Sequence, residues 1–220
     1  MAEKPTPSFD QIVQMLMQSE GDFLQRLQQQ WDSQTFVGGK RVPIQHLPKL
    51  PTKAAAEVHR VKVNLYGAKP PIWRRLEIPS AMPLDQLHEV MQIAFEWRDY
   101  HLHSFETPCG EFGPADDEDF PARKDETKAA LAQVAAAVKA KIVYTYDFGD
   151  DWRHDIVVEQ IIKAEPGVSY PRCTGGRGSA PHEDSGGIGT HNESRGDDLP
   201  FDPGEVTEDL AELARILILA

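Results

Sequence analysis

Two histidines separated by a single residue, His101 and His103, are the most direct candidates for metal chemistry in this sequence. Alternate residues of a strand project to the same side, so the two imidazoles could bind one transition-metal ion. Two imidazoles alone are too few ligands, and further ones would have to come from His154, Cys173, His182, Glu183 and Asp184. The alternative is structural: one histidine donates to a backbone carbonyl and the other is partly exposed.

The stretch YTYDFGDDWRHDI, residues 144–156, concentrates aspartates around a glycine. Asp147-Phe148-Gly149 matches the magnesium-binding motif of protein kinases, but the accompanying kinase motifs are not recognisable. A hairpin turn at Gly149-Asp150-Asp151 accounts for the same residues, because aspartate accepts hydrogen bonds from nearby amides and glycine tolerates positive φ. A third interpretation is that Asp147, Asp150 and Asp151 bind a cation or a basic partner.

A local excess of basic side chains surrounds a tryptophan early in the chain. Trp73, Arg74 and Arg75 form one candidate binding face, with more positive charge from Arg60, Lys62 and Lys69. Such a face could bind phosphate, nucleic acid or an acidic partner, and the indole could stack on a base or anchor a protein interface. The alternative is a solvated outer face of a hairpin, paired with the acidic residues 115–119, with Trp73 in or near the core.

Three other patterns argue against particular activities. The helix sequence HEVMQ, residues 88–92, lacks the second histidine of a zinc-protease motif, and GGRG, residues 175–178, does not match a phosphate-binding loop. The two cysteines, Cys109 and Cys173, have no neighbouring base that the sequence can identify. Two cysteines in 220 residues favour reduced thiols in the cytoplasm over a disulfide.

The elements that must position these residues follow from hydrophobic periodicity. A period of two over residues 58–65 and 72–78 predicts a strand–turn–strand unit, and a helical stripe over 84–97 predicts a helix after it. A short strand is expected over 100–107 and a short helix over 126–141. Two further strands are expected on either side of the aspartate turn, over 142–148 and 152–158. The sequence therefore predicts an α+β fold: a mixed sheet with a β-grasp-like hairpin–helix–strand core.

Flanking segments complete the predicted organisation. Residues 1–35 carry two short amphipathic helical patterns, and residues 36–57 are rich in proline and glycine, which is typical of a linker. The main domain is expected over 58–200, with a long loop over 166–202. Asp202 and Pro203 then predict the start of a C-terminal helix over 201–220.

The overall charge limits the classes of partner. The formal net charge is −12, so the chain as a whole repels nucleic-acid phosphates, although a local basic patch could still bind them. No apolar run is long enough for a membrane helix, and the N-terminus lacks a signal-peptide pattern. These features predict a cytoplasmic protein that does not associate with membranes.

Several segments together resemble a known family. They are GAKPPIWRRLEIPSAMPLDQLHEVMQIAFEW, HLHSF, YTYDFGDDWRHDIVVE, YPRCTGG and PHEDSGG, in this order over about residues 58–189. They resemble the plasmid pRiA-type ORF-three-like domain, some relatives of which are labelled transposon passenger or resolvase-like proteins. The resemblance implies an α+β fold and a link with mobile elements, but no established reaction. Relatives often have cysteines near PHEDSGG, where this chain has Ala180 and Ser185.

The leading hypothesis is a non-enzymatic interaction module, without a cofactor, that binds another protein or itself. Its binding face would be Trp73, Arg74 and Arg75 or the long loop, with Asp147, Asp150 and Asp151 as further candidates. The alternatives are a metal-dependent enzyme, with a divalent transition metal on His101, His103, His154, Cys173 and His182, and a nucleic-acid-binding accessory protein.

Overall fold

The computed structural model divides the chain into two units, Met1–Gln34 and Thr35–Ala220. It describes residues 33–115, 123–194 and 201–219. The helices predicted within residues 1–35, and all but the first residue of the acidic segment 115–119, therefore lie outside the described residues.

The second unit is built on an eight-stranded mixed sheet with the strand order β10-β4-β3-β9-β8-β5-β6-β7. Neighbouring strands are antiparallel except for β6 and β7, which are parallel. The strands are β3 (Glu57–Leu65), β4 (Trp73–Pro79), β5 (His103–Thr107), β6 (Gly110–Gly113), β7 (Lys124–Asp125), β8 (Lys141–Tyr146), β9 (Trp152–Lys163) and β10 (Arg172–Arg177).

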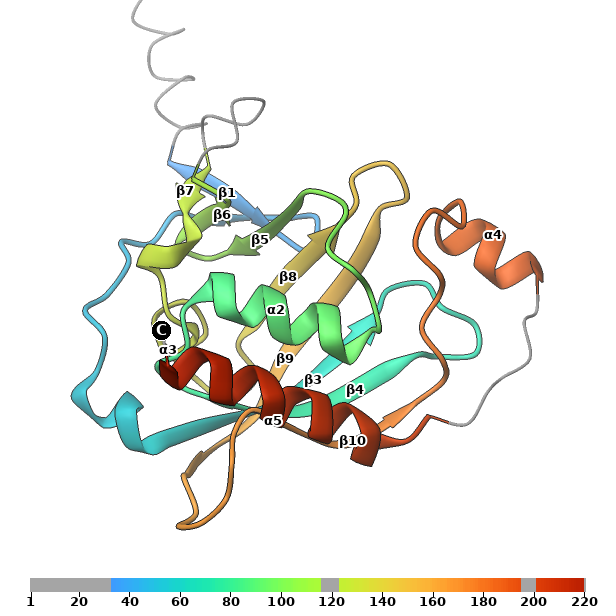
Figure 1. Cartoon of the computed structure of the whole chain (residues 1–220). Coiled ribbons are helices and arrows are strands. Elements are labelled where there is room, and N and C mark those ends of the chain that lie inside the picture. The colour runs from blue at the N-terminus through green and yellow to red at the C-terminus, as the bar shows by residue number, and fades with distance from the viewer. Residues whose placement is uncertain (1–32, 116–122, 195–200, 220) are drawn as a thin grey trace, which may run out of the picture. The chain divides into compact units, whose positions relative to one another are not determined.

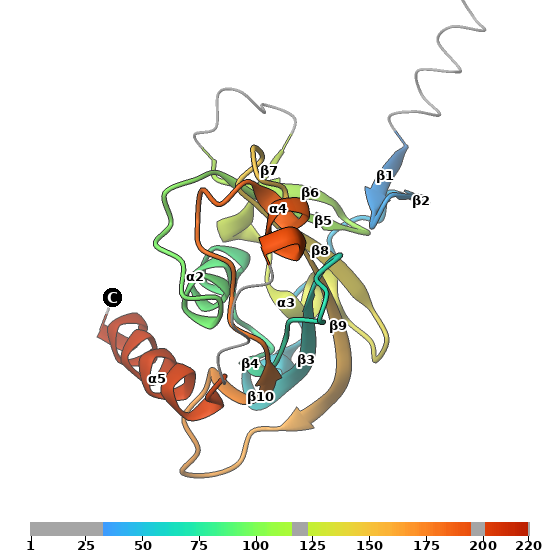
Figure 2. The ribbon, with the colours of Figure 1, turned by 90° about the vertical axis from the view of Figure 1, so that its right-hand side faces the viewer.

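Two helices lie over one face of this sheet, α2 (Leu84–Ala94) and α5 (Pro203–Leu219) (Figures 1 and 2). Helix α2 buries the predicted apolar stripe, including Leu84, Leu87 and Met91, against alternate residues of the strands. Burying each such side chain contributes about 1.5–3 kcal/mol. The shorter helical elements are α3 (Leu131–Val134), α4 (Gly187–Ser194) and the 3-10 turns η1 (Thr52–Ala56) and η2 (Glu126–Lys128).

The predicted α+β class is confirmed, as are both predicted hairpins. Strands β3 and β4 pair antiparallel, with Val61 opposite Leu76. Strands β8 and β9 pair antiparallel across the aspartate turn, with Tyr146 opposite Trp152. The sequence did not indicate that β9 lies between β8 and β3, which joins the two hairpins into one sheet.

Part of the segment predicted as a linker, residues 36–57, has regular structure. A small hairpin is formed by β1 (Gln34–Val37) and β2 (Lys40–Pro43). The backbone amide of Gly38 in its turn donates to Glu106 Oε2 at 3.0 Å. The glycines that suggested a linker instead form this turn, where both Gly38 and Gly39 have positive φ.

The short helix predicted over residues 126–141 is present, but only over Leu131–Val134. The chain there forms η2, α3 and a loop before β8 begins at Lys141. The cause is tertiary pairing: Leu84 N donates to Ala129 O and Leu131 N donates to Met82 O, both at 2.9 Å. These bonds hold Ala130 extended and override the helix propensity of the alanine-rich segment.

The long loop predicted over residues 166–202 contains a strand and a helix, β10 and α4. Glycines concealed the strand, because they are poor strand formers. A Cβ at Gly176 of β10 would lie 2.2 Å from the Phe201 ring. This glycine therefore allows close packing within a strand and does not mark a flexible loop.

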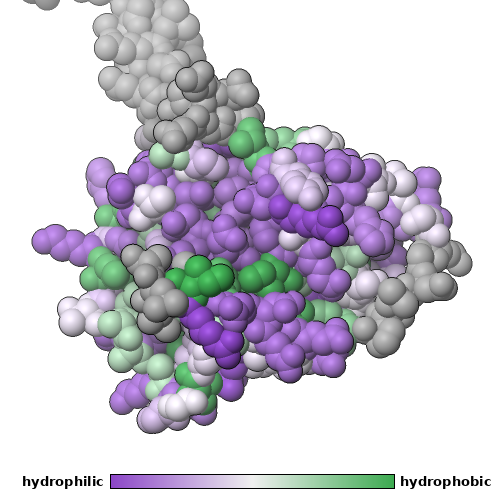
Figure 3. Space-filling view, in the orientation of Figure 1, coloured by the Kyte–Doolittle hydropathy of each residue, from purple (hydrophilic) through white to green (hydrophobic). Residues whose placement is uncertain are grey.

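Helix α5, predicted over 201–220, lies beside α2, and Asp202 Oδ1 accepts from Gly204 N at its start, at 2.7 Å. On the face in Figure 3, hydrophobic residues gather in a band between the two helices, in largely hydrophilic surroundings. Along α5, Leu213 is half-buried and Ile216 is exposed. Among the described residues, no helix has the length and apolar composition needed to cross a membrane.

Candidate functional site

Three segments that are far apart in the sequence meet at one end of the β8–β9 hairpin. They are the loop 97–102, the turn 147–151 and the segment 181–187, and together they are called the three-segment surface. Trp97 Nε1 donates to Pro181 O at 2.8 Å, and Asp147 N donates to Leu102 O at 2.9 Å. A Cβ at Gly187 would lie 2.6 Å from Asp150 O, so glycine lets segment 181–187 pack directly on the turn.

Asp147 has two roles at this surface. Its Oδ1 accepts from the amides of Gly149 at 2.9 Å and Asp150 at 3.3 Å, which is the predicted turn chemistry. Its Oδ2 lies 3.6 Å from His101 Nε2. The side chain is only 10% exposed, so one carboxylate both closes the hairpin turn and faces an imidazole.

Asp184 reaches the same imidazole from the segment 181–187. Its Oδ1 lies 2.9 Å from His101 Nε2, yet the imidazole nitrogen is out of line for a hydrogen bond. Asp184 is largely exposed and adopts a positive φ of 57°. His101, Asp147 and Asp184, called the surface histidine cluster, offer ligand atoms that all lie within 4.8 Å of one another.

Tyr146 anchors the backbone around this cluster. Its hydroxyl donates to Glu183 Oε1 at 2.5 Å and accepts from the amides of Tyr100 at 2.8 Å and His101 at 3.3 Å. Burial and the Glu183 carboxylate raise the pKa of Tyr146, so the phenol stays protonated. Glu183 Oε2 also accepts from Arg98 N. The loop that carries His101 is therefore fixed to β8 and to segment 181–187.

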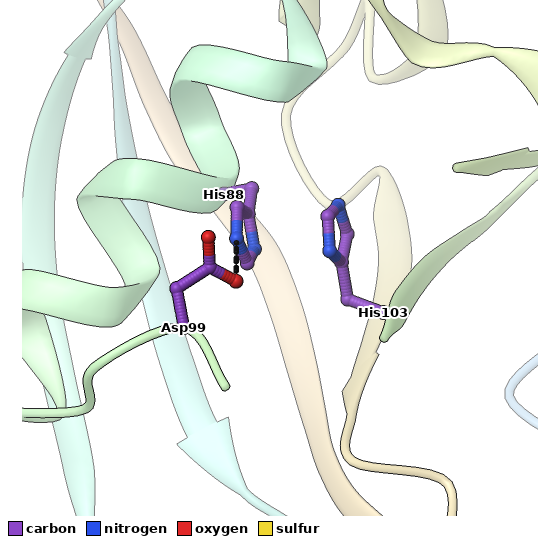
Figure 4. A group of neighbouring side chains, drawn as sticks. All are labelled: His88, Asp99 and His103. Atoms are coloured by element: carbon purple, nitrogen blue, oxygen red, sulfur yellow. Dashed lines mark hydrogen bonds and ion pairs between the residues drawn. The ribbon is translucent and has the colours of Figure 1, made fainter. Parts of the chain in front are cut away.

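A second histidine–carboxylate group lies inside the protein, between α2 and β5 (Figure 4). The rings of His88 and His103 stack with centroids 3.6 Å apart and planes 6° apart. His88 Nε2 lies 2.9 Å from Asp99 Oδ1, and His103 Nε2 lies 2.9 Å from Glu126 Oε2. His88, Asp99, His103 and Glu126 are called the buried histidine cluster, since all but Asp99 are buried.

Burial controls the charge of His88 in this interior group. It lowers the pKa of His88 to about 4, together with the neighbouring His103 and against the opposing effect of Asp99. His88 Nδ1 lies 2.8 Å from the Tyr144 hydroxyl, which also accepts from Gln92 Nε2 at 2.9 Å. Burial raises the pKa of Tyr144. His88 is thus a neutral imidazole with a partner at each nitrogen.

Comparison with known proteins assigns the chain to a family. A family model described as "Plasmid pRiA4b ORF-3-like protein" matches residues 57–197, which is more than half of the chain. The chain belongs to this family. The uncharacterized protein y4hQ of Sinorhizobium fredii (strain NBRC 101917 / NGR234) is 36% identical over 133 residues, covering 60% of this chain and 68% of that protein.

A solved structure has a similar fold. It is the crystal structure of MM3350, a protein of unknown function from Methanosarcina mazei Go1, with a TM-score of 0.62 and 32% sequence identity. The similarity covers 68% of this chain and 96% of MM3350. The resemblance to the pRiA4b ORF-3-like family seen in the sequence is therefore confirmed. Three of its segments, HLHSF, YTYDFGDDWRHDIVVE and PHEDSGG, supply the three-segment surface.

This member of the pRiA4b ORF-3-like family does not bring its five predicted metal ligands together. His101 lies in the surface histidine cluster and His103 in the buried one. His154 is buried against the rings of Phe95 and Trp97, and burial lowers its pKa to about 3. Cys173 is buried on β10, where burial raises the pKa of its thiol, and His182 is exposed.

The predicted face of Trp73, Arg74 and Arg75 is divided between two sides of the sheet. Arg74 is fully buried, its Nε donates to Ala94 O at the end of α2 at 2.8 Å, and burial lowers its pKa to about 10. Nη1 donates to the carbonyls of Trp73, Arg177 and Gly178. Arg74 therefore joins β4, α2 and the end of β10 and is not available on a surface with its neighbours.

The neighbouring arginines of this region are paired with carboxylates. Arg75 forms an ion pair with Glu159, with Nε 2.7 Å from Oε2. Arg60 and Arg172 both contact the buried Glu77 at 2.6 Å. Burial acts to raise the pKa of Glu77, but the two guanidinium groups outweigh it and lower the pKa. These contacts reduce the positive charge available to nucleic acid.

Sequence reasoning missed the buried histidine cluster. His88 follows Leu84 by four residues and so lies on the apolar stripe of α2. That position indicated that the His88 side chain would be buried. The partners Asp99, His103 and Glu126 come from a loop, a strand and a 3-10 turn, and no local pattern connects them.

Proposed function

We propose that this protein is a non-enzymatic interaction module that binds a partner protein at the three-segment surface. The observation that carries this proposal is the convergence itself. Residues 97–102, 147–151 and 181–187 are joined by hydrogen bonds, one between backbone groups and two between a backbone group and a side chain. Surface loops positioned by a rigid sheet are where binding residues most often lie.

Backbone conformation at this surface supports a functional role. Asp99, Asp147, Asp151 and Asp184 all adopt positive φ, between 53° and 58°. Aspartate tolerates this conformation better than most residues, but each instance still carries a free-energy cost. Such residues gather at ligand-binding and switch regions, where the surrounding structure holds them in place.

The exposed side chains near the cluster suit a protein partner. Tyr100 is 66% exposed and Leu102 is 42% exposed, on either side of His101. Phe148, in the adjacent turn, is 37% exposed, with Arg123 over its ring. Aromatic and aliphatic side chains that surround a polar centre are typical of protein interfaces.

The two histidines of the buried cluster are poorly placed to act as catalytic bases. A general base must come within hydrogen-bond reach of a substrate proton, whereas His88 and His103 are buried and paired with carboxylates. The proposed association with mobile elements is supported by the family description, which names a plasmid protein.

The test is recovery of a crosslinked partner from the native host. The double variant Tyr100→Ala/Leu102→Ala should reduce recovery at least about tenfold, since hot-spot truncations cost about 2 kcal/mol or more. The matched control is Val138→Ala/Ile216→Ala, which removes two side chains of similar exposure, at 52% and 57%, elsewhere on the protein.

Both double variants should keep the wild-type circular dichroism spectrum and urea midpoint, because the changed side chains are exposed. Undiminished recovery with Tyr100→Ala/Leu102→Ala, or equal loss with the control variant, would refute the proposed binding surface.

A further inference from the structure

We propose that His101, Asp147 and Asp184 bind a divalent first-row transition-metal ion, with Zn²⁺ as the best match, at the centre of the three-segment surface. The inference deepens the proposed function and rests on it for its biological role, because the ion would lie between the side chains that are proposed to meet the partner. The donors come from three separate segments, so the bound ion would also hold the surface together.

The donor distances agree with a tetrahedral ion. Zn²⁺ binds imidazole nitrogen and carboxylate oxygen at about 2.0–2.2 Å, which places two ligand atoms about 3.3 Å apart. His101 Nε2 lies 2.9 Å from Asp184 Oδ1 and 3.6 Å from Asp147 Oδ2. A change of a few tenths of an ångström in each would bring the two distances to the expected value.

The His101 side chain, which is 29% exposed, gives a further observation on the same contacts. Its Nε2 atom is shielded from solvent and has no aligned hydrogen-bond partner, although a carboxylate oxygen is 2.9 Å away. A metal ion in the plane of the imidazole ring would satisfy this nitrogen and would neutralise the two carboxylates beside it.

The surrounding carboxylates hold the donors in position. Asp147 Oδ1 is occupied by amides of the turn, so Oδ2 is the oxygen that faces His101. Asp150 Oδ2 accepts from Gly186 N at 3.0 Å, and Glu183 accepts from Tyr146 and from Arg98 N. Metal ligands that are fixed by such second interactions bind more tightly, because less ordering is needed on binding.

The donor set favours a transition metal over calcium or magnesium. Calcium and magnesium take oxygen ligands almost exclusively, whereas imidazole suits zinc and its first-row neighbours. Three protein donors leave at least one coordination position open. A carboxylate, imidazole or thiolate of a partner protein could fill that position.

The buried histidine cluster fits a metal less well, although it has the same residue types. The rings of His88 and His103 are nearly parallel, at 6°, and their in-plane lone pairs cannot converge on one ion (Figure 4). Both His88 nitrogens and His103 Nε2 are already within hydrogen-bond distance of polar atoms. The geometry therefore favours metal binding at the surface histidine cluster and a structural role for the buried histidine cluster.

The test is calorimetric titration of the chelator-treated full chain with Zn²⁺, repeated with Co²⁺ to follow its visible absorption. The wild type should bind one equivalent, and Asp184→Asn should weaken binding at least tenfold. Asp151→Asn is the matched control, since Asp151 is also an exposed turn aspartate with positive φ, of 53° against 57°. Asparagine tolerates that conformation, so both variants should fold.

Absence of stoichiometric binding by the wild type, or equal affinities of Asp184→Asn and wild type, would overturn the metal site. So would a loss of affinity in Asp151→Asn equal to that in Asp184→Asn. The proposed function fails separately: if partner recovery depends on Tyr100 and Leu102 while no metal binds, only the metal site is wrong.

Discussion

The two histidine–carboxylate clusters of this protein are made of the same residue types but differ in what surrounds them. In the buried cluster, His88 and His103 stack and each has its own carboxylate. In the surface cluster, one imidazole is shared by Asp147 and Asp184, and its nitrogen is aligned with neither. Polar groups that are fully hydrogen-bonded stabilise a fold, whereas an imidazole nitrogen that is aligned with neither of its two carboxylates is suited to a ligand.

The difference originates in the elements that carry each cluster. The buried histidines lie on α2 and β5, regular elements within the core. The surface histidine lies in a loop that is held by Tyr146 and by segment 181–187. We therefore expect changes in the buried cluster to affect stability, and changes in the surface cluster to affect binding.

The largest expected effect is a difference in protein stability between variants of the two clusters. His103→Ala leaves the Glu126 carboxylate buried without its partner, which should lower the free energy of unfolding by about 3–5 kcal/mol. His101→Ala removes a partly exposed ion pair and should cost less than about 1 kcal/mol. Urea unfolding of both variants measures this. Similar losses in the two variants would contradict the division of roles.

The second prediction concerns the loss of stability at acidic pH. Burial holds the pKa of His88 at about 4 and that of His154 at about 3 in the folded protein, below the ordinary value of 6.5. The unfolded chain therefore binds more protons as the pH falls below about 6.5, and stability is lost in that direction. Each histidine contributes about 1.4 kcal/mol per pH unit between its two pKa values.

Between pH 7 and pH 5 the free energy of unfolding should therefore fall on the order of 3 kcal/mol. Urea titrations at pH 7, 6 and 5 measure this, and His154→Leu should reduce the slope by about half. A wild-type stability that is flat over this range would show that these histidines are not held neutral.

The smallest of the three effects sharpens the comparison with a matched pair of tyrosines. Tyr144→Phe removes the hydroxyl that hydrogen-bonds to His88 and Gln92. Tyr146→Phe removes the hydroxyl that hydrogen-bonds to Glu183 and to the loop amides. Each should cost about 1–3 kcal/mol of stability, because buried polar groups lose a partner.

The two tyrosine variants should differ in metal binding. Loss of a second interaction that orients ligands weakens metal affinity about 10–100-fold, so Tyr146→Phe should bind Zn²⁺ at least about tenfold more weakly. Tyr144→Phe should bind it as the wild type does. The reverse pattern in a calorimetric titration would place the metal in the buried cluster.

Local patterns predicted much of the fold. The period of two located β3, β4, β8 and β9, and the apolar stripe located α2. The failures share a physical cause, which is that tertiary contacts decided the outcome. Pairing of residues 82–84 with 129–131 limited the helix of the alanine-rich segment to Leu131–Val134, and pairing with β4 made a strand of the glycine-rich β10.

The candidate site was harder to predict from the sequence than the fold was. Asp147 was recognised both as a turn residue and as a cation ligand, and it has contacts suited to both roles. His101 and Asp184 were singled out as metal ligands within a larger set, but the sequence could not show that His103 has separate partners. Alternation along a strand placed His101 and His103 together, whereas β5 begins only at His103.

The central claim, that the surface cluster is a ligand site and the buried cluster is part of the scaffold, is tested most directly by anomalous X-ray scattering. Crystals grown with Zn²⁺ and measured at the zinc absorption edge should show a peak about 2.0–2.2 Å from His101 Nε2, Asp147 Oδ2 and Asp184 Oδ1. A peak beside His88 or His103, or no peak at the surface cluster in crystals that contain Zn²⁺, would contradict it.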